Sequence, residues 1–308
     1  MESQSQERKG MVYAAGAYVV WGVLPMYWKL VDNVAAEEIL ANRVVWSFVF
    51  MLLVLAGSRR LGDFGRQAKA LLRQPKPFIS LIIASLLISV NWFIYIWAVN
   101  NNHIIEASLG YYINPLVSIL LGTVVLRERL SFWQYVSVLL AAAGVGVLTW
   151  NYGSFPWVSV TLAVSFALYG LAKKLTNFDS MVGLTFETLV ITPIALIYLL
   201  MQGGGSFGTE VPLSLLLMGA GAATALPLLY FAMGAKLIPL SMIGFLQYIA
   251  PTISLGLGVF LYHEHFTHTH LIAFSCIWSA LVLFSFANTR LLRHMSPKFG
   301  RQKSMKAS

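Results

Sequence analysis

Two charged side chains, Arg43 and Glu187, lie inside long apolar stretches of this sequence. An ionisable group inside a membrane is energetically costly, so each is a candidate for ligand binding or proton transfer. Glu187 is a candidate coupling site, because burial disfavours the anionic form of a carboxyl group and lets it take up a proton. A hydrogen bond to a neighbouring helix is the alternative for Glu187. For Arg43 we favour a side chain that extends toward the membrane surface over a direct role in binding.

An amide and several aromatic side chains form a second candidate group. Asn91 and Tyr95 are four residues apart, so both point to one face of a helix. Other stretches add aromatic surface: Trp21, Tyr169 and Tyr230. A cavity of aromatic rings with few hydrogen-bonding groups and almost no charge suits a neutral or zwitterionic amphipathic solute. A belt at the membrane interface is the alternative, and it better explains three residues near the ends of stretches: Trp97, Tyr111 and Trp150.

Two prolines, Pro115 and Pro251, fall in the middle of apolar stretches. A proline inside a helix leaves the carbonyl four residues earlier without its backbone donor. Those carbonyls belong to Tyr111 and Gln247, and a tyrosine follows each of them: Tyr112 and Tyr248. These groups predict a pair of polar notches that bind an amine or hydroxyl of the solute. The alternative is two kinked helices whose free carbonyls are satisfied by their neighbours.

The histidine-rich stretch from His263 to His270 is the nearest approach to a metal motif. It reads HEHFTHTH and misses the HExxH spacing by one residue, because Thr267 occupies the required place. We expect a solvated loop without metal, and the alternative is a zinc site. Phosphate-binding glycine loops, nucleophilic triads and paired catalytic carboxylates are absent from the sequence. The chain is therefore predicted not to be an enzyme and to hold no cofactor.

The elements that must carry these residues follow from composition. Of 308 residues, 58% are hydrophobic and 11% charged, whereas a soluble domain has about 25% charged residues. This excludes a soluble enzyme and a disordered chain, and the single cysteine, Cys276, excludes an intrachain disulfide. The apolar stretches have the length of transmembrane helices. We place ten near residues 10–31, 38–57, 78–99, 104–126, 131–149, 155–172, 181–201, 211–235, 238–262 and 268–289.

The net charge of +9 indicates contact with lipid rather than with nucleic acid, because the basic residues lie between the apolar stretches. With the N-terminus inside, 19 of 21 Lys and Arg residues fall on the cytoplasmic side. We therefore expect both termini in the cytoplasm. Residues 62–74 are either an interfacial helix on the anionic inner leaflet or a solvated basic loop.

An internal repeat indicates the architecture. Shifted by 136 residues, the segment 112–128 matches 248–264 at seven of seventeen positions, including a tyrosine, a proline and a glutamate. Because five spans per copy is an odd number, the second copy must cross the membrane in the opposite direction. Inverted repeats are typical of secondary transporters, whose substrate site lies near the midplane. We expect a cytoplasmic N-terminus (1–9), two inverted five-helix repeats (10–150 and 151–290) and a basic cytoplasmic tail (291–308).

Three segments carry a family resemblance: NWFIYIWAVNNNHIIEASLGYYINPL (91–116), ILANRVVWSF (39–48) and GFLQYIAPT (244–252). The chain strongly resembles the RarD-type permeases of the EamA family, in the drug/metabolite transporter superfamily. The resemblance implies a ten-helix inverted-repeat carrier of the inner membrane that works by alternating access. It also implies a central cavity lined mainly by the first, third, fourth, sixth, eighth and ninth helices. The histidine-rich stretch departs from the family pattern.

We therefore expect an all-α membrane protein that carries a small metabolite, amino-acid-like or drug-like solute by secondary transport. We favour export over uptake. The predicted partners are this solute and the lipid bilayer, with a homodimer left open. The expected solute contacts are Trp21, Asn91, Tyr95, Tyr112, Tyr169, Tyr230, Gln247 and Tyr248. The alternative is a membrane-embedded sensor or enzyme with a metal site at the outer histidine-rich loop and no net transport.

Overall fold

The computed structural model describes residues 2–73, 75–101, 103–176, 178–263 and 267–287. In these ranges the chain is helical and contains no strand, and ten helices are long and apolar enough to cross a membrane. The prediction of an all-α membrane protein is confirmed, and each predicted span corresponds to one of these helices. By its contacts the chain divides into two compact units, Met1–Glu128 with Tyr152–Phe266, and Arg129–Asn151 with Thr267–Ser308.

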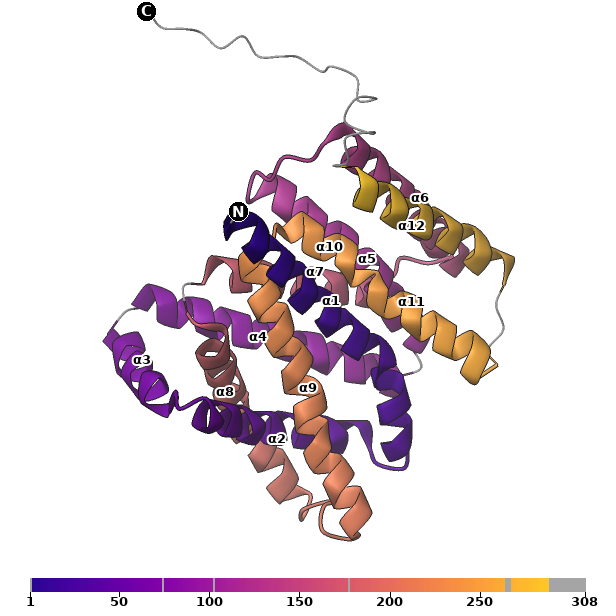
Figure 1. The fold of residues 1–308 in the computed structure, drawn as a ribbon. Coiled ribbons are helices and arrows are strands. Elements are labelled where there is room, and N and C mark those ends of the chain that lie inside the picture. Colours follow the sequence, from indigo (N-terminus) through magenta and orange to yellow (C-terminus); the bar gives the residue numbers. More distant parts are fainter. Residues whose placement is uncertain (1, 74, 102, 177, 264–266, 288–308) are drawn as a thin grey trace, which may run out of the picture. The chain divides into compact units, whose positions relative to one another are not determined.

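The larger unit contains most of the helices (Figure 1). Its first half holds α1 (Glu2–Trp28), a short 3-10 turn (Lys29–Val31), α2 (Ala36–Gly57), α3 (Leu61–Arg73), α4 (Pro75–Asn100) and α5 (Ile104–Val124). Its second half holds α7 (Trp157–Leu175), α8 (Ser180–Met201), α9 (Val211–Leu237), α10 (Leu240–Gln247), α11 (Ile249–Gly256) and a π-helical turn (Leu257–Leu261).

The helices of the larger unit pack in a regular set of pairs. α1 packs on α9 and α11, α2 on α8 and α9, α4 on α7 and α8, and α5 on α7 and α10. In Figure 1 the indigo α1 runs beside the orange α9. A glycine allows one of these close approaches: a Cβ atom on Gly22 of α1 would lie 2.7 Å from Ile253 Cβ of α11. Small residues bring membrane helices close enough for tight packing.

The smaller unit consists of α6 (Phe132–Tyr152) and α12 (His268–Phe286). The two helices pack closely at Gly144, where an added Cβ atom would lie 2.6 Å from the carbonyl oxygen of Ala273. Both helices expose large apolar side chains, such as Leu139 and Val282. This is the pattern of helices that face lipid.

The two repeat-related prolines differ in structure. Pro115 lies inside the continuous helix α5, whereas Pro251 follows the interruption at Tyr248 that separates α10 from α11. Tyr248 itself keeps right-handed helical backbone angles, with φ of −64° and ψ of −13°. Since a proline removes the donor of the carbonyl four residues earlier in either case, the two polar notches stay a prediction.

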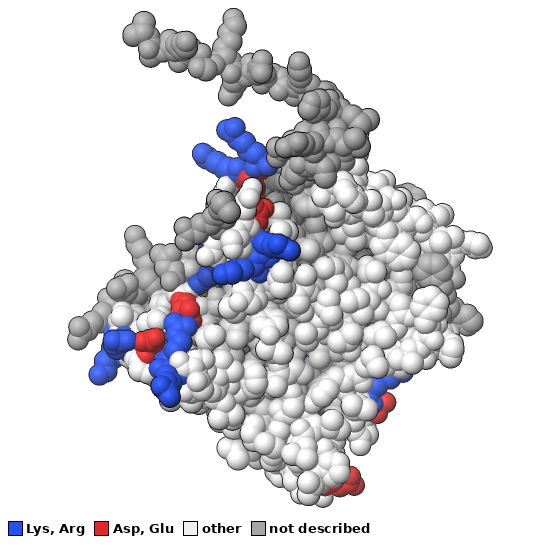
Figure 2. Space-filling model, viewed as in Figure 1, with Lys and Arg blue, Asp and Glu red and all other residues white. Residues whose placement is uncertain are grey.

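Residues 61–73 form a helix rather than a loop. Its apolar side packs against protein, where the Phe64 ring stacks on Phe186 of α8 at 4.4 Å between centroids. Its basic side faces outward, since the Arg66 side chain is 82% exposed. Lys and Arg side chains gather on one side of the face shown in Figure 2, from the N-terminal end of α1 to α3, while the surface over α9 is uncharged.

Two carboxylates, Glu106 and Glu128, bind backbone amides at the starts of neighbouring helices. Glu128 accepts backbone hydrogen bonds from Leu240 (2.6 Å) and Ser241 (2.8 Å) at the start of α10. Glu106 accepts one from Val158 (2.7 Å) at the start of α7. The first N–H groups of a helix have no partner within it, and a carboxylate also complements the helix dipole there. These two acidic residues therefore connect α5 to its neighbours.

Candidate functional site

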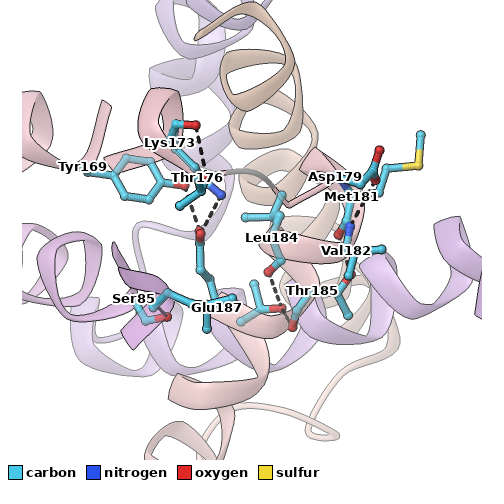
Figure 3. Close-up of polar contacts among 12 residues, drawn as sticks. Ser85, Tyr169, Lys173, Thr176, Asp179, Met181, Val182, Leu184, Thr185 and Glu187 are labelled. Carbon is cyan, nitrogen blue, oxygen red and sulfur yellow. Dashed lines mark hydrogen bonds and ion pairs between the residues drawn. The ribbon is translucent and has the colours of Figure 1, made fainter. Parts of the chain in front are cut away.

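An ion pair joins α7 to α8 inside the larger unit. Glu187 Oε1 lies 2.6 Å from Lys173 Nζ, and its Oε2 accepts a hydrogen bond from the Tyr169 hydroxyl at 3.0 Å (Figure 3). Tyr169 and Lys173 are one turn apart on α7, so both face α8. All three side chains are buried, with residue exposures of 0–4%. The carboxylate thus has both a charge partner and a hydrogen-bond donor.

This arrangement differs from the sequence-based expectation. The predicted sixth span, 155–172, ends just before Lys173, whereas α7 continues to Leu175 and Lys173 is only 3% exposed. The helix therefore runs three residues past the predicted end of the span. The hydrogen bond expected as the alternative for Glu187 is present, and the ion pair is an additional contact that the sequence did not reveal.

A small cavity of about 10 Å³, the scale of one water molecule, lies beside this pair. Its lining includes Glu187, Lys173, Asp179 and Lys236. Asp179 caps α8 and forms an ion pair with Arg60 at 3.0 Å. The hydrogen bond that Arg60 donates to Asp179, together with the charge of that carboxylate, raises the pKa of Arg60 above its ordinary value. The cavity therefore has basic and acidic groups from three helices within reach of one another.

A polar centre forms where α1, α5 and α10 meet. The Ser118 hydroxyl donates to Gln247 Oε1 at 3.2 Å and lies 3.4 Å from Asn114 Oδ1. Tyr18 of α1 is 3% exposed, and none of the described residues forms a hydrogen bond with its hydroxyl. Gln247 lies within electrostatic range of that hydroxyl without making a hydrogen bond of normal geometry. A buried polar atom without a partner is costly, so this hydroxyl is a candidate contact for a solute or a water molecule.

Sequence reasoning missed Tyr18. Its one signal is its place a single turn before Trp21 on α1, which puts both rings on the same face. The two rings lie 5.4 Å apart between centroids. Trp21 also packs on Phe166 and Phe231, and Tyr169 stacks on Phe231 at 5.9 Å. The structure thus brings Trp21 and Tyr169 to one aromatic cluster.

The remaining predicted contacts lie in other places. Asn91 donates its amide to the Leu162 carbonyl and to Ser165 Oγ, both at 2.9 Å on α7. Its amide therefore links two helices. Tyr95 pairs with Tyr111 at 6.2 Å between ring centroids, and Tyr230 contacts the Tyr13 ring at 5.9 Å.

Tyr112 and Tyr248, the two repeat-related tyrosines, contact one another. The Tyr248 hydroxyl donates to the Tyr112 carbonyl at 3.3 Å. This bond joins the two segments of repeated sequence, 112–128 and 248–264. It lies next to the Tyr111 and Gln247 carbonyls, which were predicted to lack a backbone donor.

Arg43 contacts side chains from three helices. Its Nε donates to Thr224 Oγ1 at 2.9 Å, near the middle of α9. The guanidinium carbon lies 4.8 Å from the Trp28 ring centroid and 5.4 Å from that of Trp92. Because Trp28 is the last residue of α1, the extension of this side chain toward the membrane surface stays a prediction.

Of the histidine-rich stretch, Glu264 and His265 lie outside the described residues. Within the described part of the chain, no three His, Cys, Asp or Glu side chains form a metal-binding group. His270 has a local role: Thr267 and His270 form a capping box at the start of α12.

Comparison with known proteins places these features in context. Two ranges of the chain, 8–150 and 156–286, match the EamA-like transporter family. The chain is 51% identical over 295 residues to a Bacillus subtilis protein named uncharacterized transporter YojE, covering 94% of this chain and 97% of that protein. It is 41% identical over 283 residues to protein RarD of Escherichia coli, covering 91% and 94%. A solved crystal structure shares the fold with a TM-score of 0.72 at 19% identity, covering 92% of this chain and 99% of that one.

Proposed function

Because the chain belongs to the EamA-like transporter family, as a RarD-type membrane transporter of the drug/metabolite class, we propose that it is a secondary carrier. It moves a small metabolite, amino-acid-like or drug-like solute outward across the bacterial inner membrane by alternating access. Its two inverted five-helix repeats, 10–150 and 151–290, enclose the solute site, and both termini are cytoplasmic.

The observation that carries this proposal is the symmetry of the helix pairs. In chain order the ten spans are α1, α2, α4, α5, α6, α7, α8, α9, α10 with α11, and α12. Exchanging each span of the first five with the span five places later turns the pair α5–α7 into α11–α1, α1–α9 into α7–α4 and α2–α9 into α8–α4. All of these pairs are in contact. The pairs α2–α8 and α5–α10 exchange with themselves. A bundle built this way can change which side is open by moving one repeat against the other.

The local backbone supports the same repeat. Arg127 and His263 are 136 residues apart, follow corresponding spans, and both adopt left-handed conformations with φ of 56° and 55°. Left-handed residues are uncommon outside glycine and often end helices. Two copies of one fold are expected to end their corresponding helices with the same backbone conformation.

The polar centre supports the solute site. Tyr18, Ser118 and Gln247 come from α1, α5 and α10, and Trp21 supplies aromatic surface one turn away. An amphipathic solute would satisfy the unpartnered Tyr18 hydroxyl and pack on the Trp21 ring.

Proton coupling at Glu187 would act through its ion pair with Lys173. Protonation of Glu187 would remove the charge that Lys173 now compensates and would loosen α7 from α8. The sequence contains no ATP-binding motif, so we assign the driving force to an ion gradient. Such a step would connect proton movement to the relative motion of two helices that line the bundle.

Transport by purified protein in liposomes tests the solute site. The test solute is chosen first: it is whichever of L-phenylalanine, indole and chloramphenicol raises the melting temperature of the purified protein most. Tyr18→Phe should slow its saturable flux about two- to tenfold, the effect of one lost hydrogen bond, without lowering stability. Tyr135→Phe on α6, where the tyrosine is exposed, is the control. Unchanged flux in both Tyr18→Phe and Tyr248→Phe would contradict the site, and flux that never saturates would indicate a channel.

The same liposomes test coupling. An imposed pH gradient should accelerate flux by the unmodified protein, and Glu187→Gln should remove that response because the amide cannot ionise. A Glu187→Gln protein that still responds to the gradient would exclude Glu187 as the coupling residue.

A further inference from the structure

Arg43 is a charged residue of a membrane-spanning helix that has no charge partner in the described part of the chain. It lies seven residues after the start of α2, about 10 Å along the helix axis. Among the described residues no carboxylate lies within ion-pair distance of its guanidinium. Glu38, one turn earlier, is used elsewhere: it accepts hydrogen bonds from the Ser206 backbone and side chain.

The guanidinium keeps its charge in this position, since arginine does not lose its proton in proteins. Trp28 and Trp92 offset part of the cost of burial by presenting their rings to the cation. The two indole rings accept no conventional hydrogen bond, so the N–H groups of the guanidinium need other acceptors. Nε donates to Thr224, whereas the described residues supply no acceptor for the two terminal nitrogens. Two parallel donors on that edge match the two oxygens of a carboxylate.

Two phenols complete the surroundings. Tyr95 and Tyr111 lie within electrostatic range of Arg43, from α4 and α5. Tyr111 is 52% exposed and Arg43 is half-buried, so this cluster borders open space. Tyr111 was interpreted from sequence as part of an interfacial belt, but its nearness to Arg43 gives its hydroxyl a second use as a donor to the same anion.

One face of α1 connects this cluster to the polar centre. Tyr18, Trp21, Pro25 and Trp28 follow one another at steps of three, four and three residues, which keeps them on one side of the helix. The ten residues from Tyr18 to Trp28 span about 15 Å. That length fits a small molecule with an apolar body between two polar ends.

We propose that Arg43 binds the carboxylate of the transported solute, so that the substrate class is small carboxylates with an apolar or aromatic body, including amino acids. The apolar part lies along the Trp21 face of α1, and Tyr95 and Tyr111 donate to the same carboxylate. This inference rests on the proposed transport function and specifies its substrate. A lipid phosphate is the other oxyanion that could reach Arg43, and the experiment separates the two.

Binding is measured on the purified full chain by thermal shift and titration calorimetry. The carboxylate probes are L-phenylalanine and 3-phenylpropionate, and the matched neutral or cationic probes are 3-phenylpropionamide and L-phenylalaninamide. We expect the carboxylates to bind more tightly than their amides. Arg43→Gln should weaken carboxylate binding about ten- to a hundredfold, as expected for a lost charge-assisted pair, with little effect on the amides. Arg66→Gln, on the exposed side of α3, is the control and should bind like the unmodified protein.

Equal carboxylate affinity in Arg43→Gln and unmodified protein would overturn the proposal, as would amides that bind as tightly as the acids. If Arg43→Gln does not fold, Arg43→Lys replaces it: it keeps the charge but loses the paired donors, and should lose most of the preference for acids over amides. Melting temperatures in vesicles of phosphatidylcholine with and without phosphatidylglycerol decide the lipid case. An Arg43-dependent gain with phosphatidylglycerol, without carboxylate binding, would assign Arg43 to lipid and overturn the proposal.

Flux assays keep the two proposals apart. Saturable transport of the amides or chloramphenicol without transport of either acid would overturn the carboxylate site but leave the carrier function intact. Arg43-dependent carboxylate binding without flux of any probe would support the site and count against the carrier function.

Discussion

Glu187 and Arg43 are both charged residues in membrane-spanning helices, but only Glu187 has an oppositely charged partner among the described residues. Glu187 has a cation at 2.6 Å and a phenol at 3.0 Å, so its charge is compensated within the protein. Arg43 has one hydroxyl and two indole rings, and the described residues offer it no opposite charge. A compensated pair makes a structural link that a proton can break, whereas an uncompensated cation is completed by a ligand from outside.

The largest expected effect comes from breaking the compensated pair. Lys173→Met would leave the buried Glu187 carboxylate without its cation and should lower the free energy of unfolding by about 3–5 kcal/mol. Chemical unfolding in detergent, followed by circular dichroism, measures it. The double change Lys173→Met with Glu187→Leu should recover most of the loss, and Lys69→Met on the exposed side of α3 is the control. A single variant as stable as the control would show that the pair contributes nothing.

A smaller effect is expected from the phenol of the same cluster. Tyr169→Phe removes a hydrogen bond to the Glu187 carboxylate but keeps the ring stacked on Phe231. The loss should be about 1.5–3 kcal/mol, the range for hydrogen bonds to charged groups. The same unfolding assay measures it, and a neutral result would mean that Lys173 alone satisfies the carboxylate.

The smallest effect on stability is expected at Arg43, which sharpens the contrast. Arg43→Met removes a half-buried cation and leaves no opposite charge behind among the described residues, so the free energy of unfolding should change by no more than about 1 kcal/mol. A loss as large as that of Lys173→Met would mean that Arg43 is a structural residue with a partner, and the comparison between the two charges would fail.

The sequence allowed the spans and the family to be predicted, since both rest on local patterns. Twenty apolar residues between charges form a transmembrane helix whatever surrounds them. Tyr112 and Tyr248 align in the repeated sequence and also lie in contact, but the alignment alone did not predict that contact. The family match then agreed with the resemblance seen in the residues.

Contacts between helices were less predictable, because they depend on rotation and register. Lys173 falls just outside the predicted span 155–172, because hydropathy alone ends a span at the first charge. The partners of Arg43 on α1, α4 and α9 are distant in sequence, so no local pattern indicates them. Tyr18 is one of many aromatic residues, and only packing shows that its hydroxyl has no hydrogen-bond partner among the described residues. Pro115 and Pro251 occupy repeat-related positions, yet α5 is continuous around Pro115 whereas a turn at Tyr248 separates α10 from α11.

The Glu128 contact at the start of α10 limits how the molecule can open. Its carboxylate belongs to the segment just after α5 but holds two backbone amides of α10, and Gly122 leaves no room for a side chain between them. These helix ends are therefore joined through one side chain, and rotation of the Glu128 carboxylate would release both backbone amides together. If the chain works by the proposed alternating access, α5 and α10 stay together at this end while Glu128 holds both amides, and the entrance for the solute forms between other helices.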